Sequence, residues 1–325
     1  MERRFRRLLG RLRRLAHPGP RIIPGADPAI RDPALEGVAA DTFFTKCSSF
    51  GEFETFAAQH SQLFQDRAAF ESALVPPNEY FSIVGFCVPC NQETTFMVDY
   101  LYSLTREDGT RVPNWRERVI CGRCKLPNRL RAAADFMEHA LKLDPSSTLY
   151  VSEQTTPFYR FLKRRYPKTF GSEFLTDGTA CGRSNWLGIR HEDLTKLSLD
   201  TSSVDAICTS DVLEHVPNYT SAISECFRVL KPGGSLIISV PFLLGSRETL
   251  VRARINADGA LEHLLTPEYH GDPVNARGVL CYYHFGWDLL DSLKAAGFND
   301  AALYFYWSCR YGYLGGMQFL ICATR

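Results

Sequence analysis

This 325-residue sequence lacks three features, and each absence narrows what the protein can do. No apolar run approaches the roughly 18 residues that a membrane-spanning helix requires. The formal net charge is only +1, so the chain lacks the strongly basic balance of many nucleic-acid-binding proteins. The stretch "STLYVSEQTTPFYRFL", residues 147–162, reads as a strand turning into a helix but contains no glycine. A dehydrogenase or a sugar-nucleotide enzyme is therefore disfavoured, because it would need a glycine-rich loop there.

Four of the eleven cysteines form two C-x-x-C pairs, and the other seven are scattered singly. Thirty residues with turn signals separate the pairs, so four thiolates can converge on one tetrahedral zinc ion. We predict a structural Zn²⁺ site formed by Cys87, Cys90, Cys121 and Cys124. A redox-active dithiol is the alternative. The odd cysteine total without a secretory signal favours a reducing compartment, so we expect a cytoplasmic protein.

The N-terminal segment is unusually basic, with seven arginines in its first fourteen residues and apolar residues at helical spacing. Such a helix can lie on an anionic membrane surface, so peripheral membrane contact through this arginine-rich segment is one expectation. A disordered basic tail and an organelle transit peptide are the alternatives. Five prolines follow within residues 17–35, and we interpret residues 1–40 as a basic tail and proline-rich linker.

Three further regions follow this linker. We predict a helical segment over residues 41–78, a four-cysteine zinc ribbon over 79–135 and an α/β domain over 136–325. In the last region, short β-branched runs alternate with helical patterns, which predicts a parallel sheet covered by helices on both faces. Basic residues after the second cysteine pair raise the possibility of nucleic-acid recognition, but the near-neutral charge disfavours that partner. These basic residues are Lys125, Arg129 and Arg131.

Acidic residues follow the predicted strands at informative distances. Glu173 comes twenty-one residues after Ser152, at the end of the second apolar run. An acidic residue in this place accepts hydrogen bonds from ribose hydroxyls in Rossmann-type sheets. Asp193 follows a short third strand, where a carboxylate can accept a hydrogen bond from an adenine amine. The spacing thus predicts a nucleoside-binding crevice at one edge of the sheet.

The most specific text is "SSVDAICTSDVLEHVPNYTSAISECFRVLKPGGSLIISVPF", residues 202–242. It resembles the second half of class I S-adenosylmethionine-dependent methyltransferases, and the resemblance extends over residues 147–325. It implies a Rossmann-like seven-stranded mostly parallel sheet, with an antiparallel hairpin from residues 301–307 and 317–323 at its end. It also implies S-adenosyl-L-methionine as the cofactor. By this resemblance the cofactor contacts are Glu173 for the ribose, Asp193 with Leu194 for the adenine, and Ser210 with Asp211 for the methionine part.

The first turn departs from the family pattern, since "SEQTTP" replaces its glycine-rich loop. S-adenosylmethionine has no pyrophosphate, so a phosphate-cradling loop is not required. Ser152, Glu153, Gln154 and Thr155 can instead supply an acidic partner for the cofactor amine, amides and hydroxyls. The turn resembles that of some bacterial methyltransferase-like proteins with an N-terminal cysteine ribbon, several of which occur beside glycan-assembly enzymes.

A methyl transfer to a hydroxyl needs a positioned base, and histidine suits that role. His270 and His284 lie in a long aromatic stretch after the fifth strand, and His215 follows the fourth. We predict that these three histidines are the catalytic candidates for a small-molecule or glycan-like acceptor; packing of the loop is the alternative role. The alternative function is a cofactor-free module whose zinc ribbon recognises a protein or nucleic acid.

Overall fold

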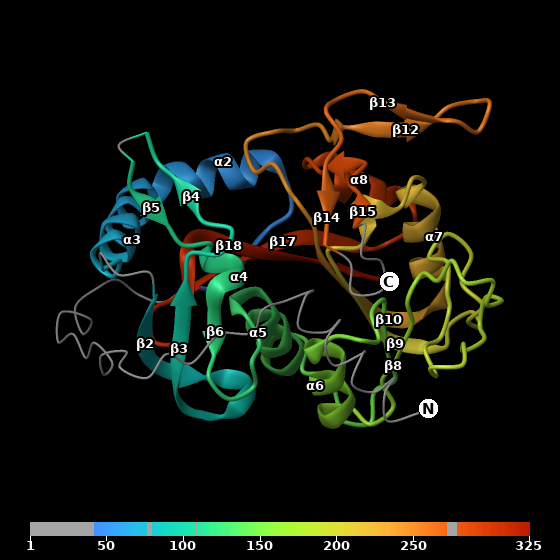
Figure 1. Ribbon diagram of the computed structural model, residues 1–325, viewed down its shortest axis with the longest axis horizontal. Helices are drawn as coiled ribbons and strands as arrows, with labels where there is room; N and C mark the ends of the chain where they lie inside the picture. Colours follow the sequence, from blue (N-terminus) through green and yellow to red (C-terminus); the bar gives the residue numbers. More distant parts are fainter. Residues whose placement is uncertain (1–41, 77–79, 108, 272–277) are drawn as a thin grey trace, which may run out of the picture.

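The computed structural model describes residues 42–76, 80–107, 109–271 and 278–325, so the predicted basic tail lies outside the described residues (Figure 1). Its centre is a seven-stranded sheet. In spatial order the strands are β1 (Thr42–Cys47), β17 (Asp300–Ser308), β18 (Tyr313–Thr324), β10 (Leu230–Ser239), β9 (Val204–Ser210), β7 (Leu149–Val151) and β8 (Phe170–Gly171). No helix in these ranges is long and apolar enough to cross a membrane.

One half of the sheet is parallel and confirms the predicted α/β, Rossmann-like class. Strands β8, β7, β9 and β10 pair in parallel, and their apolar runs are buried because helices cover the sheet. Helix α6 (Pro157–Arg165) connects β7 to β8, and α7 (Tyr219–Val229) connects β9 to β10. Thr156 starts α6 by accepting a hydrogen bond from Tyr159 N, with Pro157 in the first turn.

The other half is antiparallel and differs from the expectation in two ways. The predicted hairpin forms as β17 and β18, but it is not the end of the sheet, because β1 pairs antiparallel with the outer side of β17. The prediction of a helical segment from residue 41 is therefore wrong for Thr42–Cys47. Without β1, the edge of β17 would leave amides and carbonyls unpaired. Pairing with β17 therefore makes Thr42–Cys47 a strand despite the helical sequence pattern. The helices begin later, with α2 (Phe50–Gln59) and α3 (Ser61–Ala73), while the expected third parallel strand is reduced to a bridge between Glu173 and His191.

The cysteine-bearing module contains a three-stranded and a two-stranded antiparallel sheet and packs beside the β17–β18 hairpin (Figure 1). It contains β2 (Tyr80–Cys87), η2 (Val88–Cys90), β3 (Gln92–Asp99), β4 (Leu104–Thr105), β5 (Arg111–Val112), α4 (Trp115–Arg118) and β6 (Val119–Cys121). Helix α5 (Asn128–Asp135), followed by η3 (Phe136–Ala140), leads out of it. Arg131 on α5 is fully buried, donates to Gly312 O at 2.8 Å and lies 4.1 Å from the centre of the Phe96 ring. This arginine joins the module to the hairpin and is not available to nucleic acid.

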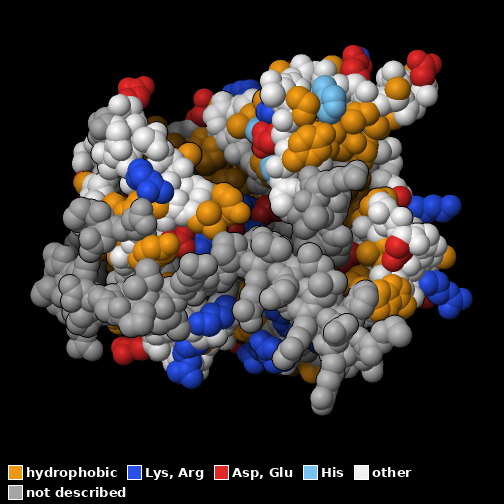
Figure 2. Space-filling view, viewed as in Figure 1, with side chains coloured by type: hydrophobic (Ala, Val, Ile, Leu, Met, Phe, Trp, Pro, Cys, Tyr) orange, Lys and Arg blue, Asp and Glu red, His pale blue; other side chains and the backbone are white. Residues whose placement is uncertain are grey.

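The chain between β9 and the last helix adds a lobe of short elements to the sheet. These are η4 (Leu213–His215), β11 (Leu250–Val251), β12 (Ala253–Ile255), β13 (Leu261–His263), β14 (Tyr269–His270), β15 (Val279–Leu280) and β16 (Tyr283–His284), followed by α8 (Asp288–Ala295). Their strands pair as β11 with β16, β12 with β13, and β14 with β15. Figure 2 shows hydrophobic side chains and a histidine gathered on this upper lobe. Its exposed apolar residues include Leu250, Ile255, Leu261 and Tyr269, so the lobe presents an apolar surface beside the sheet.

Candidate functional site

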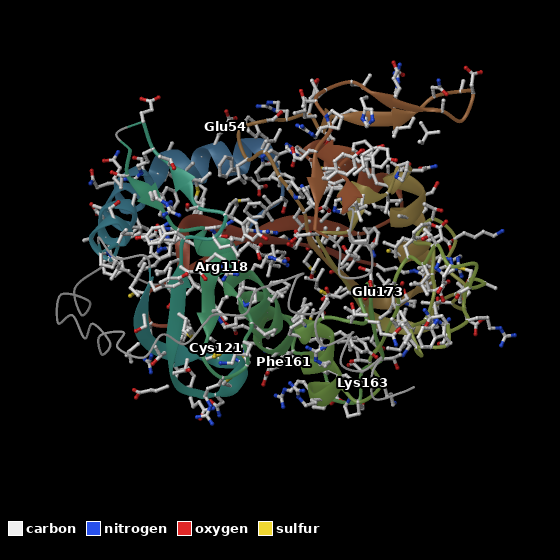
Figure 3. All side chains as sticks on the ribbon, in the orientation of Figure 1. Glu54, Arg118, Cys121, Phe161, Lys163 and Glu173 are labelled. Atoms are coloured by element: carbon white, nitrogen blue, oxygen red, sulfur yellow. The ribbon has the colours of Figure 1, made fainter. Side chains whose placement is uncertain are left out.

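The parallel half of the sheet brings several predicted residues to one edge. Ser152 and Glu153 follow β7, Glu173 follows β8, and Ser210 and Asp211 lie at the end of β9. Ser152 N donates to Cys208 O at 3.1 Å, so the ends of β7 and β9 are joined directly. In open parallel sheets, ligands bind at the carboxyl ends of the strands. Figure 3 shows Glu173 in this region, apart from Cys121 on the cysteine module.

The glycine-free turn after β7 is held by the Glu173 carboxylate. Glu173 Oε1 accepts hydrogen bonds from Gln154 N at 2.8 Å, from Thr155 N at 2.9 Å and from Thr155 Oγ1 at 2.8 Å. The side chain of Gln154 accepts from Arg190 N at 2.8 Å and donates to Gly188 O at 2.9 Å. The turn therefore uses side chains to fix its backbone, and one oxygen of Glu173 is committed to that purpose.

Unpartnered polar atoms gather beside this turn. Four buried side-chain atoms there have no hydrogen-bond partner among the described residues: Ser152 Oγ, Glu153 Oε1, Thr209 Oγ1 and Arg129 Nη1. Burial, together with the nearby Glu173 and Asp211, raises the pKa of Glu153 to about 7, although Arg129 opposes the rise. Buried polar atoms without partners are uncommon in proteins and indicate a bound water, ion or ligand, or a functional role. They therefore mark this edge as a place for a polar ligand.

Two arginines bind Asp211, one from the cysteine module and one from α5, the helix that leads out of it. Arg116 Nη2 on α4 lies 2.7 Å from Asp211 Oδ1, and Arg129 Nη2 on α5 lies 2.9 Å from Asp211 Oδ2. Ser239 Oγ donates to the same carboxylate at 3.1 Å. Burial alone would raise the pKa of Asp211, but Arg116 and Arg129 hold it well below its usual range. Neither arginine was predicted for this site. The contact is visible only in the folded protein, where both arginines lie beside the end of β9.

The residues expected around adenine make local contacts. Asp193 Oδ1 accepts hydrogen bonds from Thr195 N at 2.8 Å and Thr195 Oγ1 at 2.7 Å, which fixes its own turn. Leu194 is buried in the main core. The adenine contact of Asp193 and Leu194 therefore stays a prediction.

The three predicted histidines come together around two glutamates that the sequence did not single out as ligands. His270 Nε2 lies 2.9 Å and His284 Nε2 lies 3.2 Å from Glu268 Oε1. His270 Nδ1 lies 3.6 Å and His215 Nε2 lies 3.7 Å from Glu214 Oε1. Cys281, Glu214 and Glu268 raise the pKa of His270 to about 11. The histidine–glutamate cluster, defined as these five histidine and glutamate residues, begins three residues beyond Asp211.

The four predicted cysteines also converge. Their sulfurs all lie within 4.8 Å of one another, with Cys87 Sγ 3.8 Å from Cys124 Sγ and Cys90 Sγ 3.9 Å from Cys121 Sγ. A tetrahedral zinc ion with Zn–S bonds of about 2.3 Å needs sulfurs about 3.8 Å apart. Arg123 N donates to Cys121 Sγ at 3.3 Å, as expected for a turn that stabilises thiolates. Four thiols at this spacing fit a zinc ion and leave no ligand position for a substrate.

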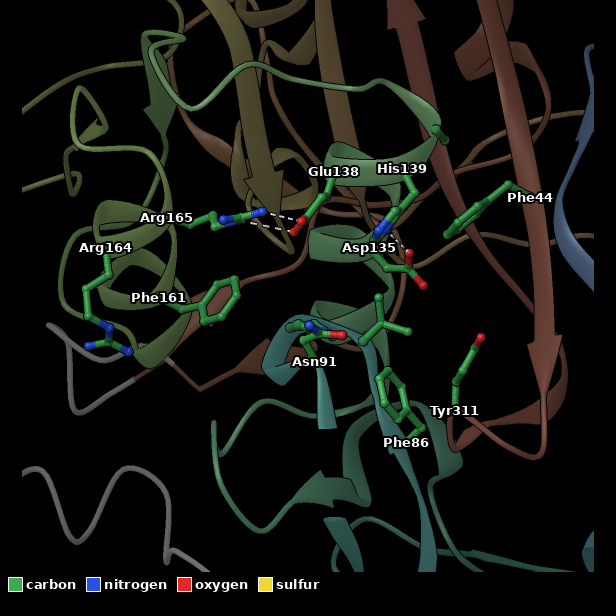
Figure 4. A pocket seen from close by; sticks show the side chains of 13 residues that line it. Phe44, Phe86, Asn91, Asp135, Glu138, His139, Phe161, Arg164, Arg165 and Tyr311 are labelled. Carbon is green, nitrogen blue, oxygen red and sulfur yellow. Dashed lines mark hydrogen bonds and ion pairs between the residues drawn. The ribbon is translucent and has the colours of Figure 1, made fainter. Parts of the chain in front are cut away.

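The pocket in Figure 4 is separate from the carboxyl ends of β7 and β9. It has a volume of about 910 Å³ and is lined by residues that include Phe86, Asn91, Asp135, Phe161 and Arg165. None of its lining residues is a predicted cofactor or catalytic residue. A smaller space of about 10 Å³ lies by Arg129, Ser210 and Ser239. We place the site at this edge because its unpartnered polar groups, rather than the size of a hollow, indicate chemistry.

Comparisons with known proteins agree with the predicted resemblance to class I methyltransferases. Residues 160–238 match a family model described as a methyltransferase domain. A protein of Mycolicibacterium smegmatis, named a probable S-adenosylmethionine-dependent methyltransferase, is 45% identical over 53 residues, or 16% of this chain and 21% of that protein. A demethylmenaquinone methyltransferase of Deinococcus radiodurans is 31% identical over 118 residues, or 34% of this chain and 47% of that protein. The chain thus spans less than half the length of these curated relatives.

Solved structures give matches over a longer stretch. An S-adenosylmethionine-dependent methyltransferase from Mesorhizobium loti is 18% identical, covering 60% of this chain and 100% of that chain, with a TM-score of 0.37. The topology of the central sheet, described above from its own hydrogen bonds, carries the fold assignment.

The raised pKa of Glu153 predicts a specific pH dependence of stability. The folded protein retains this proton up to a pKa of about 7, whereas the ordinary value is 4.5. Stability is therefore lost as the pH rises through this window, because the folded state binds more protons than the unfolded state. From pH 5 to pH 8 the wild type should lose about 2 kcal/mol of unfolding free energy through Glu153. Glu153→Gln, which cannot titrate at this position, should not show that loss.

Urea denaturation of the cofactor-free protein at these two pH values measures this difference. Glu262→Gln on β13, where the side chain is 42% exposed, is the matched control and should not change with pH in this way. Parallel pH profiles for Glu153→Gln and the wild type would show that Glu153 titrates normally.

Proposed function

We propose that this protein transfers a methyl group from S-adenosylmethionine to an acceptor. The observation that carries the proposal is the gathering of unpartnered polar groups at the carboxyl ends of β7 and β9, beside a segment that matches a methyltransferase domain. This edge is where an open parallel sheet binds its ligand. S-adenosylmethionine needs acceptors for its amine and donors for its carboxylate, and both kinds of group are present.

The methionine end of the cofactor has matched partners on this edge. Glu153 has a carboxylate oxygen without a partner in the described chain, and it can pair with the cofactor amine. Arg129 Nη1, also unpartnered there, can donate to the cofactor carboxylate, while its Nη2 holds Asp211. Ser152 and Ser210 border the same space. We assign these groups to the methionine part.

The nucleoside end is assigned by position in the fold. Glu173 lies just beyond the end of β8, where sheets of this type place their ribose contact. Its Oε1 holds the turn at Gln154 and Thr155, so ribose binding and turn position are coupled through one carboxylate. Asp193 and Leu194 are assigned to the adenine.

The acceptor side is the histidine–glutamate cluster. His215, His270 and His284 lie on η4, β14 and β16, close to the end of β9. Imidazoles held by carboxylates can orient an acceptor hydroxyl and take its proton during an in-line methyl transfer. Exposed aromatic and apolar residues on the same lobe, such as Tyr269 and Leu261, suit an acceptor that stacks on rings. We propose a small-molecule or glycan-like acceptor with a hydroxyl group.

The cysteine module has a structural role in this proposal. A zinc ion held by the four cysteines would stabilise a module whose own apolar core is small. That module carries Arg116, while α5, which leads out of it, carries Arg129; both bind Asp211. Zinc binding would therefore fix the two arginines at the cofactor edge, that is, at the carboxyl ends of β7 and β9, without taking part in the reaction.

Cofactor binding can be tested by calorimetry with purified protein. We expect the wild type to bind S-adenosylmethionine, and we expect Glu153→Ala and Arg129→Ala to weaken binding at least about tenfold, since each removes a charged partner. Glu262→Gln is the control and should bind normally. Absence of heat at millimolar cofactor would overturn the enzyme proposal in favour of the cofactor-free module.

Metal analysis tests the role of the cysteines. We expect about one zinc ion per chain in the purified protein, and we expect Cys121→Ser to lose it and to lower the thermal stability of the cysteine module. Cys181→Ser, a change at an exposed single cysteine, is the control. A zinc content well below one per wild-type chain, or a zinc content in Cys121→Ser equal to that of the wild type, would contradict the four-cysteine site.

A further inference from the structure

We propose that Glu214, His215 and His270 bind a divalent transition-metal ion, which holds the hydroxyl oxygen of the methyl acceptor. The metal site stands on the contacts of these three side chains. Its effect on the acceptor rests on the proposed methyl transfer. The site is distinct from the four cysteines, since its ligands are nitrogen and oxygen atoms on η4 and β14.

Glu214 is the first reason for a cation at this position. Its side chain is 0% exposed, and neither carboxylate oxygen has a hydrogen-bond partner within the described ranges. A buried carboxylate without hydrogen bonds needs positive charge beside it, and a metal ion held between Glu214 and the two neighbouring imidazoles would supply that charge directly. Glu214 lies in η4, between the cofactor edge at Asp211 and the lobe that contributes His270. Its two oxygens are therefore available to an ion between these parts.

The distances are the second reason. Glu214 Oε1 lies 3.7 Å from His215 Nε2 and 3.6 Å from His270 Nδ1, beyond the usual length of a hydrogen bond. Ligand atoms about 2.1 Å from one metal ion lie about 3.0–3.4 Å apart. The three ligand atoms all lie within 4.8 Å of one another. Small side-chain movements would bring them onto a single ion.

The hydrogen bonds of the imidazole rings are the third reason. His215 Nδ1 lies 2.8 Å from Leu280 O, a carbonyl that can only accept, so this nitrogen carries the proton. His270 Nε2 likewise lies 2.9 Å from Glu268 Oε1 and donates to it. The other nitrogens, His215 Nε2 and His270 Nδ1, face the Glu214 carboxylate, and a metal ion bound there would replace any proton they carry. Carbonyl and carboxylate partners of this kind orient metal-binding histidines in proteins.

Glu268 is itself held in place by neighbouring groups. Arg252 Nη2 lies 3.2 Å from Glu268 Oε2, and His284 Nε2 lies 3.2 Å from Glu268 Oε1. Glu268 therefore acts through His270 rather than as a ligand. A set of two histidines and one carboxylate suits Mn²⁺, Fe²⁺, Co²⁺ or Zn²⁺ and leaves positions open for water or substrate.

The open position suggests the chemistry. With the ion bound, His215 and His270 would act as ligands rather than as bases, and a hydroxyl oxygen on the ion would have a lowered pKa and lose its proton to water. The oxygen then forms a bond to the methyl carbon of S-adenosylmethionine as the carbon–sulfur bond breaks. The bonding pair stays on sulfur, which gives S-adenosylhomocysteine and the methylated acceptor. No oxidant or reductant is needed.

Mn²⁺ is the probe for the experiment, because it prefers oxygen and nitrogen ligands and will discriminate against the four cysteines. We expect electron paramagnetic resonance titration of the full chain to show one Mn²⁺ site. Glu214→Gln, His215→Ala and His270→Ala should each weaken it at least about tenfold. His263→Ala, on β13 outside the cluster, is the control and should bind as the wild type does. Equal Mn²⁺ affinity in the wild type and in Glu214→Gln, or no Mn²⁺ binding at millimolar concentration, would overturn the proposal.

Thermal stability gives a second readout that does not depend on activity. Mn²⁺ should raise the melting temperature of the wild type but not that of Glu214→Gln, because only the wild type gains binding energy. The melting temperature of each protein without metal is the baseline for this shift. A variant that responds to Mn²⁺ like the wild type would contradict the site.

Calorimetry with S-adenosylmethionine and no added Mn²⁺, under conditions that leave the cysteine-bound zinc in place, separates this proposal from the proposed function. Cofactor binding without any Mn²⁺ site would overturn the metal proposal and leave the methyltransferase intact. Mn²⁺ binding that the three ligand variants abolish, in a protein that does not bind the cofactor, would support the metal site and overturn the methyltransferase.

Discussion

The structure depends on the ion pairs that Asp211 makes with Arg116 and Arg129. Asp211 is at the carboxyl end of β9, whereas both arginines come from the region of the cysteine module. The three charged groups are partly buried, and each is paired, so removing one would leave a partly buried charge uncompensated. These contacts fix the module against the sheet edge, so the cysteine site, the sheet and the proposed cofactor site form one physical unit. Glu117 extends the network by pairing with Arg129 Nε at 2.6 Å.

A carboxylate also orders the glycine-free turn after β7. A glycine-rich loop brings backbone amides to a ligand because it has no side chains in the way. Here the amides of Gln154 and Thr155 are bound by Glu173, and the turn gains order from a carboxylate instead. Gly171, just before this carboxylate, has no room for a Cβ, which would lie 2.4 Å from Glu153 O. Close packing between β7 and β8 is therefore retained even though the turn residues differ.

The sequence was sufficient where structure follows local pattern. Alternating strands and helices predicted the parallel half, and the strand ends then placed Glu173 and Asp211 at one edge, because parallel strands end together. The two C-x-x-C pairs predicted a convergence that the sulfur distances match. Contacts between distant segments could not be predicted in this way. Arg116 and Asp211 are 95 residues apart in the chain, and strand β1 forms only because β17 leaves an open edge.

The charges at the cofactor edge also imply how binding and protonation are linked. S-adenosylmethionine carries a positive amine and a positive sulfonium, so its arrival beside Glu153 would favour the ionised carboxylate. Because the pKa of Glu153 is about 7 in the structure, a large fraction of the protein holds that proton near neutral pH. Binding would therefore release a proton, and part of the cofactor's electrostatic attraction would be used to ionise this buried group. If the proposed site binds S-adenosylmethionine, the carboxylate of Glu153 would therefore discriminate in favour of a cationic ligand.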